Sequence, residues 1–180
     1  MNSDLVVISG GPGAGKTTVI EELRRLGFAC VAEVARQIIQ EQVRESGAAL
    51  PWADRELYTR LMLERSIASY RAHASASRPT FFDRGIPDTL GYARLIGLEQ
   101  DAPIREACQI FRYAKRVFLA PPWKEIYGTD AERKQDFAEA ERTFDVIRQT
   151  YSECGYEIVE LPKTSTRERA KFILTNSTGS

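Results

Sequence analysis

Residues 5–17 read LVVISGGPGAGKT, an apolar run that leads directly into a glycine-rich stretch ending in Lys-Thr. The run is almost continuously apolar, as expected for a strand that is buried on both faces of a parallel sheet. Residues 17–26 then place four apolar side chains on one helical stripe, and Gly27 is positioned to end that helix. A strand, a glycine-rich turn and a helix in this order predict the first βα unit of an α/β sheet.

The glycine-rich stretch is a nucleotide-binding motif, because residues 10–17 match the pattern G-x-x-x-x-G-K-[ST] at every position. Glycines let successive backbone N–H groups turn inward around a phosphate, and the helix that follows adds the positive end of its dipole. The lysine reaches the β- and γ-phosphates, while the threonine hydroxyl ligates Mg²⁺. We therefore expect ATP and Mg²⁺ here, with Lys16 as a catalytic residue and Thr17 as a metal ligand. The predicted ATP-binding residues are Gly11, Gly13, Ala14, Gly15, Lys16, Thr17 and Thr18.

Four more apolar runs predict strands, at residues 28–33, 79–83, 116–120 and 156–161. Helical spacing predicts helices between them, at residues 34–46, 54–73, 130–154 and 166–175, with two more inside 88–114 that break near 97–103. The helix over 54–73 is predicted from Asp54 as its N-cap and from a stripe of Leu57, Leu61, Glu64 and Ile67, which is apolar but for one acid. This alternation predicts a doubly wound parallel α/β sheet in a single domain of residues 1–175, with a frayed polar tail at 176–180.

Composition narrows the classes of function. The 180-residue chain has 25 basic and 25 acidic side chains, a balance that argues mildly against a nucleic-acid partner or a membrane surface. No apolar stretch approaches the roughly 18 residues needed to span a bilayer, and no signal peptide is recognisable, so we expect a cytoplasmic protein. Cys30, Cys108 and Cys154 show no CxxC spacing and are expected to be reduced, mostly buried thiols. The sequence does not indicate an oligomeric state.

A second candidate segment is FFDRGIPD at residues 81–88. The carboxyl ends of strands border the ligand crevice in open α/β sheets, so Asp83 and Arg84 are expected beside the glycine-rich loop. The alternative is an ion pair that only caps the strand. The chain lacks the N-K-x-D element of GTPases, and Arg84 stands where an ATPase motor would place Glu. These features favour a small-molecule kinase or a nucleotide-binding module.

Four segments together resemble a known family: VVISGGPGAGKTTVIEEL, VAEVARQII, FFDRGIPDTLGYARL and VFLAPPWKEIYGTDAERK. They look like small P-loop proteins often labelled AAA-type ATPases, which are similar to nucleoside and nucleotide kinases and notably to the ribosylnicotinamide kinase domain. The resemblance covers nearly the whole chain. It implies a P-loop NTPase fold of three layers, α/β/α, whose five-stranded parallel sheet has the kinase-type order 2-3-1-4-5. It does not name a phosphoryl acceptor.

The resemblance also implies roles for individual residues. The Asp83-Arg84 pair is similar to an acid-arginine pair in thymidylate and deoxynucleoside kinases, where the acid lies near Mg²⁺ and the arginine faces the acceptor or the transferring phosphoryl group. Asp83 is thus a candidate metal ligand and catalytic residue, and Arg84 a catalytic one. Glu33 would be a general base for an acceptor hydroxyl, or else an ion-pair partner of Arg36. Lys163 would flank the adenine.

A lid is expected at about residues 121–135. Thr129 and Glu132 fit a capping box, which would place Arg133 in the first turn of a helix, where closure could bring it onto phosphate as a catalytic residue. The alternative for Arg133 is a solvated surface charge. Four aromatic residues, Trp52, Tyr58, Tyr92 and Trp123, are candidates either for stacking on a nucleoside or for ordinary packing.

The sequence therefore favours an ATP- and Mg²⁺-dependent kinase that acts on an unidentified small molecule, with a nucleoside- or nucleotide-like acceptor. A second hypothesis is an ATP-binding or ATPase module that regulates a partner and has no phosphoryl acceptor. A third, a nucleic-acid-directed ATPase or polynucleotide kinase, is disfavoured by the neutral charge balance.

Overall fold

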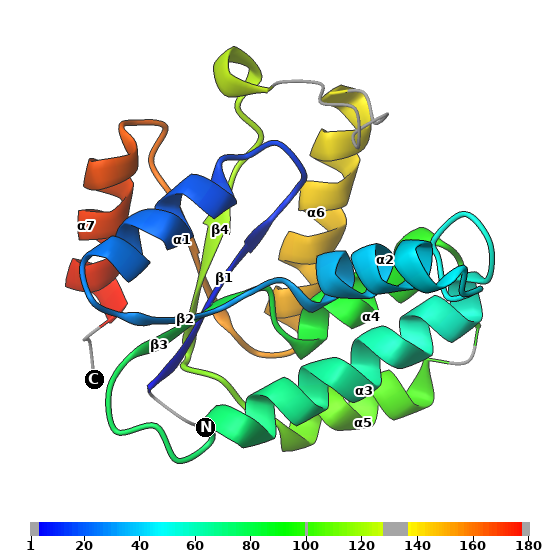
Figure 1. Cartoon of the computed structure of the whole chain (residues 1–180). Coiled ribbons are helices and arrows are strands. Elements are labelled where there is room, and N and C mark those ends of the chain that lie inside the picture. Colours follow the sequence, from blue (N-terminus) through cyan, green and yellow to red (C-terminus); the bar gives the residue numbers. More distant parts are fainter. Residues whose placement is uncertain (1–3, 100, 128–136, 178–180) are drawn as a thin grey trace.

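The computed structural model describes residues 4–99, 101–127 and 137–177, which form a parallel sheet with helices on both faces (Figure 1). The five strands lie in the order β2-β3-β1-β4-β5. Their bounds are β1 Leu5–Gly10, β2 Ala29–Val31, β3 Thr80–Asp83, β4 Arg116–Ala120 and β5 Glu157–Glu160. Every pairing is parallel, so the predicted fold class and strand order are both confirmed.

The helices follow the predicted order. They are α1 Lys16–Arg25, α2 Val34–Glu45, α3 Arg55–His73, α4 Ile86–Leu95, α5 Ala102–Ile110, α6 Phe137–Glu153 and α7 Thr166–Ser177, with a 3₁₀ turn η1 at Lys124–Ile126. Helix α7 continues two residues past the predicted domain bound of 175, and the carbonyl of Asn176 accepts a hydrogen bond from Arg116 Nη1 at 3.1 Å; residues 178–180 of the predicted tail lie outside the described residues. Within the described ranges, no helix combines the length and apolarity needed to cross a membrane.

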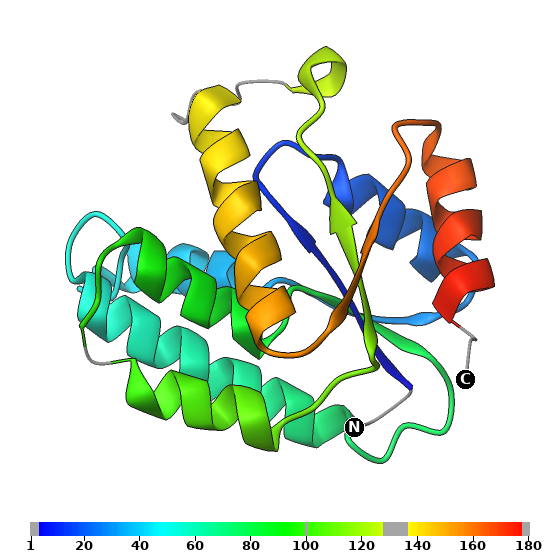
Figure 2. The same ribbon diagram turned by 180° about the vertical axis from the view of Figure 1, so that it is seen from behind.

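Strand β1 lies at the centre of the sheet and is buried along its whole length. Leu5 and Val7 point into a core that they share with α4, α5 and α6, whereas Val6 and Ile8 point into a core shared with α1 and α7. Figures 1 and 2 show these two helical layers on opposite faces of the sheet. A strand that is covered on both faces needs apolar residues at successive positions, which explains the continuous apolar run.

Helices α2 and α3 pack outside α4, around a small third core of Ile38, Tyr58 and Met62. Asp54 caps α3 as predicted, with Oδ1 accepting a hydrogen bond from the Leu57 amide at 2.9 Å. Leu61 and Ile67 of the predicted stripe are partly buried and pack against the cores, but the fully buried side chains of α3 are Tyr58, Thr59, Met62 and Ser66, which the stripe did not include. Thr59 tolerates burial because its hydroxyl donates to the Arg55 carbonyl at 2.7 Å, so a polar residue occupies the face that leucine spacing was expected to mark.

Candidate functional site

The glycine-rich loop joins β1 to α1 at the carboxyl end of the sheet. Gly15 is the N-cap of α1 with φ +73°, and a Cβ at Gly13 would lie only 2.6 Å from the Tyr127 ring, so both conformation and close packing call for glycine. Lys16 Nζ donates to the carbonyls of Gly10 at 3.2 Å and Gly11 at 2.7 Å. Burial, assisted by the charge of Arg84, lowers the pKa of Lys16 to about 8.

The remaining loop residues open the first turn of α1. Thr17 and Thr18 are exposed, and the Thr18 hydroxyl donates to the Gly15 carbonyl at 2.9 Å. The backbone amides of this turn have no earlier helical carbonyl to pair with, so together with the dipole they favour an anion. The loop thus has the shape and polarity that its motif predicts for binding phosphate.

Strand β3 ends at Asp83, which pairs in register with Ile8 of β1 and therefore lies next to the loop, as predicted. Its Oδ1 atom is buried without a hydrogen-bond partner among the described residues. Burial raises the pKa of Asp83 to about 6, although the nearby Lys16 ammonium acts in the opposite direction. A buried acceptor that lacks a partner costs roughly 1–3 kcal/mol, so this carboxylate is placed to bind a cation or a donor.

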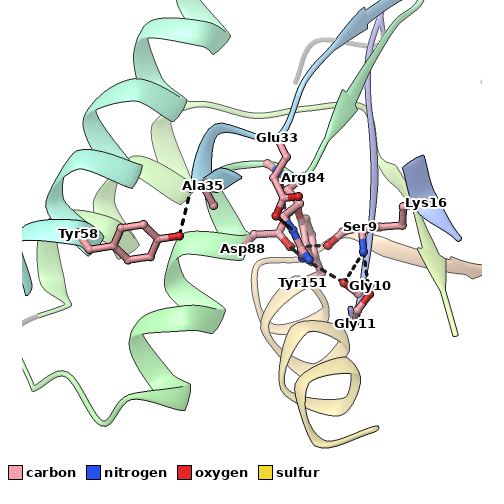
Figure 3. Close-up of polar contacts among 11 residues, drawn as sticks. Ser9, Gly10, Gly11, Lys16, Glu33, Ala35, Tyr58, Arg84, Asp88 and Tyr151 are labelled. Atoms are coloured by element: carbon pink, nitrogen blue, oxygen red, sulfur yellow. Dashed lines mark hydrogen bonds and ion pairs between the residues drawn. The ribbon is translucent and has the colours of Figure 1, made fainter. Parts of the chain in front are cut away.

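Arg84 follows in a left-handed backbone conformation with φ +70°. For a residue with a side chain this conformation costs roughly 1–2 kcal/mol. Three acceptors hold the guanidinium: Nε donates to Glu33 at 2.7 Å, and Nη1 donates to both the Gly10 carbonyl and Asp88 at 3.0 Å (Figure 3). Arg84 therefore joins β3, the glycine-rich loop and the starts of α2 and α4.

Asp88 is a central residue of this site that the sequence reasoning missed. It is only 4% exposed and accepts hydrogen bonds from the Ser9 hydroxyl, from Tyr151 OH at 2.5 Å and from the Gly85 amide at 2.8 Å, in addition to Arg84 (Figure 3). Its position in the first turn of α4, four residues after Arg84, was the available signal. The partners on β1 and α6 lie far away in the sequence and gave none.

Glu33 lies at the N-cap position of α2, and its carboxylate pairs with Arg84. The sequence offered two roles, a general base or a partner of Arg36, and it did not anticipate this ion pair. Burial alone would raise the pKa of Glu33, but the positive charges of Arg84, Lys16 and Arg36 together lower it below its usual value. Glu33 is consequently ionised at neutral pH and accepts hydrogen bonds.

A cavity of about 600 Å³ opens beside these charges, between α2, α3, α4 and α6. Glu33, Arg84 and Asp88 line its polar end. Tyr58 and Tyr92 line its wall with their rings edge to face, 5.4 Å apart, and the buried Tyr92 hydroxyl has no partner among the described residues. Apolar lining comes from Met62, Leu95, Ile96 and Ile147, and further charges come from Arg55, Glu139 and Arg142.

The other two aromatic candidates lie elsewhere. Trp52 is 66% exposed in the turn before α3. Trp123 precedes η1 and lies 5.8 Å from the guanidinium of Arg169, a residue that the sequence reasoning missed. Arg169 lies on α7, is 2% exposed and donates a hydrogen bond to the Ala14 carbonyl at 3.1 Å. This hydrogen bond connects α7 to the glycine-rich loop.

Two predicted site residues remain to be located, Lys163 and Arg133. Lys163 is exposed in the loop between β5 and α7. Arg133 and the capping box of the predicted lid lie outside the described residues, which include only positions 121–127 of that segment. In the described part, η1 precedes Tyr127, whose ring lies over the glycine-rich loop at Gly13.

Asp83 is the strongest candidate for a metal ligand among the described residues. No three His, Cys, Asp or Glu side chains within residues 4–99, 101–127 and 137–177 cluster closely enough to hold one. Magnesium in phosphoryl-transfer sites is instead bound by one or two protein oxygens together with substrate phosphates and water. The unpartnered oxygen of Asp83, beside the loop that carries Thr17, fits that mode of binding.

The chain is similar to known proteins in its sequence profile and in its fold. The sequence profile of the family described as "AAA domain" matches residues 5–169. No curated protein matches the sequence. Among solved structures, the NadR protein in complex with NR is similar with a TM-score of 0.73 and 19% identity, over 99% of this chain and 52% of NadR. The chain thus spans about half the length of NadR.

Two complete kinases are also similar. Deoxyadenosine kinase from M. mycoides with bound dATP has a TM-score of 0.57 and 13% identity, over 97% of this chain and 100% of its own. Shikimate kinase from Acinetobacter baumannii in complex with shikimate has a TM-score of 0.54 and 16% identity, over 96% and 91%. At these identities the similarity establishes the fold, which is that of P-loop kinases.

Proposed function

We propose that this chain, which belongs to the AAA domain family, is an ATP- and Mg²⁺-dependent small-molecule kinase with a nucleoside- or nucleotide-like acceptor. The observation that carries the proposal is the convergence of two cations on one carbonyl. Lys16 Nζ and Arg84 Nη1 both donate to the Gly10 oxygen, at 3.2 and 3.0 Å, where the glycine-rich loop meets the large cavity. Like charges this close favour an anion between them, as a transferring phosphoryl group would be.

Each residue has a role on this proposal. The loop amides and Lys16 hold the phosphates of ATP, and Arg84 stabilises the charge on the transferring phosphoryl group. Thr17 and Asp83 would hold Mg²⁺, which when bound supplies charge neutralisation across the phosphates. Glu33 orients the acceptor hydroxyl by accepting its hydrogen bond at the polar end of the cavity, and its lowered pKa makes positioning its main contribution. Arg133 and Lys163 remain predicted contacts to phosphate and adenine.

The cavity supports an acceptor with a flat ring. Tyr58 and Tyr92 offer aromatic surface, and the Tyr92 hydroxyl offers a buried polar group that a ring nitrogen or exocyclic group would satisfy. A volume of about 600 Å³ accommodates a nucleoside or a nucleotide. The fold alone does not select this acceptor, because shikimate kinase shares it.

The alternative is an ATP-binding or ATPase regulatory module without an acceptor. The observation in its favour is that Arg84 already has three protein acceptors, as a structural arginine would. In that case ATP would bind at the glycine-rich loop, and the large cavity would take no phosphoryl acceptor.

The test is the release of ADP from Mg²⁺-ATP with and without pooled nucleosides, nucleotides and sugars. We expect one pool to raise turnover, and Lys16→Ala and Asp83→Asn each to reduce it by about 10²-fold or more. Asp145→Asn, an exposed change on α6, is the matched control and should behave like the native protein. If no pool raises turnover while ATP still binds, the regulatory module is favoured; an unchanged rate in Asp83→Asn would remove Asp83 from the mechanism.

A further inference from the structure

A second, smaller cavity of about 170 Å³ lies where α4, α5 and the end of α6 meet, and it shares no lining residue with the large one. Two of the three cysteines line it, Cys108 on α5 and Cys154 directly after α6. Three arginines and one glutamate complete its charged lining: Arg94, Arg105, Arg112 and Glu153. Neither the proposed kinase reaction nor any predicted role uses these residues.

The two thiols line the same cavity and are not equivalent. Cys108 is 2% exposed, whereas Cys154 is partly exposed. The neighbouring Cys108 thiol, opposed by burial and aided by the charges of Arg112 and Arg94, lowers the pKa of Cys154 to about 7. The neighbouring Cys154 thiol and burial both raise the pKa of Cys108. The partly exposed Cys154 is therefore the thiol that a reagent reaches first, whereas the buried Cys108 is shielded from solvent.

Cys30 is an internal comparison within the same chain. Its thiol lies 3.6 Å from the carbonyls of Ile20 and Phe28, and burial raises its pKa. It lines neither cavity. A reagent that reads thiolate character should therefore distinguish Cys154 from Cys30.

The arginines are held in place by the surrounding elements. Arg94 donates to the Thr150 hydroxyl at 3.0 Å and to Glu153 at 2.5 Å. Arg112 donates to the Cys108 carbonyl at 3.1 Å, with its guanidinium 4.1 Å from the centre of the Tyr156 ring. Arg105 is half-exposed and pairs with Asp101, which does not line the cavity. With Glu153 in the lining and Asp101 paired to Arg105, three positive groups face two negative ones, so the cavity keeps a net positive charge.

We propose that this cavity is a thiol-modification site for a small disulfide that carries carboxylates. The Cys154 thiolate attacks one sulfur of the reagent, forms a mixed disulfide and releases one reagent thiolate. The Cys108 thiol then loses its proton to solvent and attacks the Cys154 sulfur, which releases the second reagent thiolate and forms a Cys108–Cys154 disulfide. Two protein thiols are oxidised and one disulfide of the reagent is reduced to two thiols.

The arginines account for the choice of an anionic reagent. Glutathione disulfide carries several carboxylates, whereas cystamine carries two ammonium groups on the same kind of sulfur–sulfur bond. A cationic cavity attracts the first and repels the second, and such steering changes association rates by roughly tenfold or more at low salt. This inference does not depend on the identity of the kinase acceptor, because none of its residues belongs to that site.

The experiment treats the full chain with each reagent and follows intact mass and peptide maps. We expect the native protein to lose about 2 Da through a Cys108–Cys154 bond, while Cys108→Ser retains one reagent half at Cys154 and Cys154→Ser gains nothing at Cys108. Glutathione disulfide should react about tenfold faster than cystamine at low salt, and 0.5 M NaCl or Arg105→Gln should reduce that ratio.

A pH series supplies an independent readout. The rate at which neutral iodoacetamide alkylates Cys154 should rise through pH 7 as its thiolate forms, while Cys30 should react only at higher pH. The charged and titratable groups that line the cavity with Cys154 are Arg94, Arg105, Arg112, Glu153 and Cys108.

Equal rates for the two disulfide reagents would overturn the anion recognition. A native protein that retains a stable adduct on Cys154 would overturn the role of Cys108, and modification of Cys30 first would overturn the site itself. Arg105→Gln changes a half-exposed side chain, so it tests the proposal even if the core variant Cys108→Ser fails to fold.

Discussion

At the scale of single residues, Arg84 combines a strained backbone with a dense set of charges. Its left-handed conformation is retained because Glu33, Asp88 and the Gly10 carbonyl fix the guanidinium from three directions. Lys16 lies at the same carbonyl, so the acids around the two cations offset their repulsion. The arrangement holds positive charge in a fixed place before any substrate arrives, which is the condition for electrostatic catalysis.

Asp88 should be the acid on which this arrangement most depends for stability. Asp88→Asn keeps the side-chain size but loses the negative charge that faces Arg84. It also points an amide N–H at one or more groups that already donate to Asp88. We therefore expect the free energy of unfolding to fall by about 2–3 kcal/mol. Tyr151→Phe removes one donor and should cost about 1 kcal/mol. Urea unfolding measures both, with the exposed Asp145→Asn as control. If Tyr151→Phe costs more than Asp88→Asn, Asp88 is not the centre of the network.

At the scale of elements, the residue that ends α2 has a strained backbone conformation that a substitution should relieve. Ser46 is its C-cap at φ +53°, exposed, in a conformation that glycine adopts without strain. Ser46→Gly should raise the free energy of unfolding by about 0.5–1 kcal/mol, the relief of strain exceeding the added entropy of the unfolded chain.

The matched control is Ser152→Gly, because Ser152 is exposed inside α6, where glycine should instead lower the free energy of unfolding by about 0.5 kcal/mol. Chemical denaturation of both variants decides the matter. Opposite signs are expected, and equal losses would mean that the backbone of Ser46 is not strained.

The contact between α4 and α6 depends on a glycine for a different reason. A Cβ at Gly91 would lie 2.5 Å from Ile147 Cδ1, and Ile147 is only 2% exposed. Gly91→Ala should destabilise the protein by about 1–3 kcal/mol despite the better helix propensity of alanine.

Ile147→Val removes the atom that would clash. The double variant Gly91→Ala/Ile147→Val should therefore be less destabilised than the sum of the two single variants, by at least about 0.5 kcal/mol in a double-mutant cycle of denaturation free energies. Additive losses would contradict the steric explanation.

At the scale of the whole molecule, nucleotide binding should stabilise the fold. Mg²⁺-ATP at about one hundred times its dissociation constant adds about 2.7 kcal/mol, which for a chain of this size raises Tm by roughly 5–10 °C. Differential scanning fluorimetry measures the shift. Lys16→Ala should lose most of it, and ATP with EDTA should give a smaller shift than Mg²⁺-ATP. The same shift in Lys16→Ala would contradict the binding role of Lys16.

The features that could be predicted are those that appear in the sequence as short contiguous motifs or apolar runs. The glycine-rich loop is contiguous, and the buried strands appear as apolar runs, so fold class and strand order followed, the latter through resemblance. Asp83 could be placed beside the loop because strand ends in such sheets converge. The face of α3 could not be predicted, because Thr59 satisfies its hydroxyl within the helix and is buried where leucine spacing gave no sign.

The contacts of Asp88 and of the cysteine pair could not be predicted from the sequence, for a different reason. Ser9 and Tyr151 reach Asp88 from β1 and α6, and Cys154 meets Cys108 across α5 and α6. No short pattern records that juxtaposition, since it arises only when the helices pack on the sheet. The roles assigned to the site residues stay predictions until substrates are tested, and this holds for Lys16, Thr17, Glu33, Asp83, Arg84, Arg133 and Lys163.

The central place of β1 also constrains the order of events as the chain is synthesised. Both neighbours of β1, residues 80–83 and 116–120, leave the ribosome long after the glycine-rich loop. Arg84, which contacts that loop, emerges directly after β3, and Tyr127, which also contacts it, emerges after β4. The loop therefore lacks β4, one of the two strands that flank β1, until residue 120 has been synthesised, and nucleotide can assist folding only from that point.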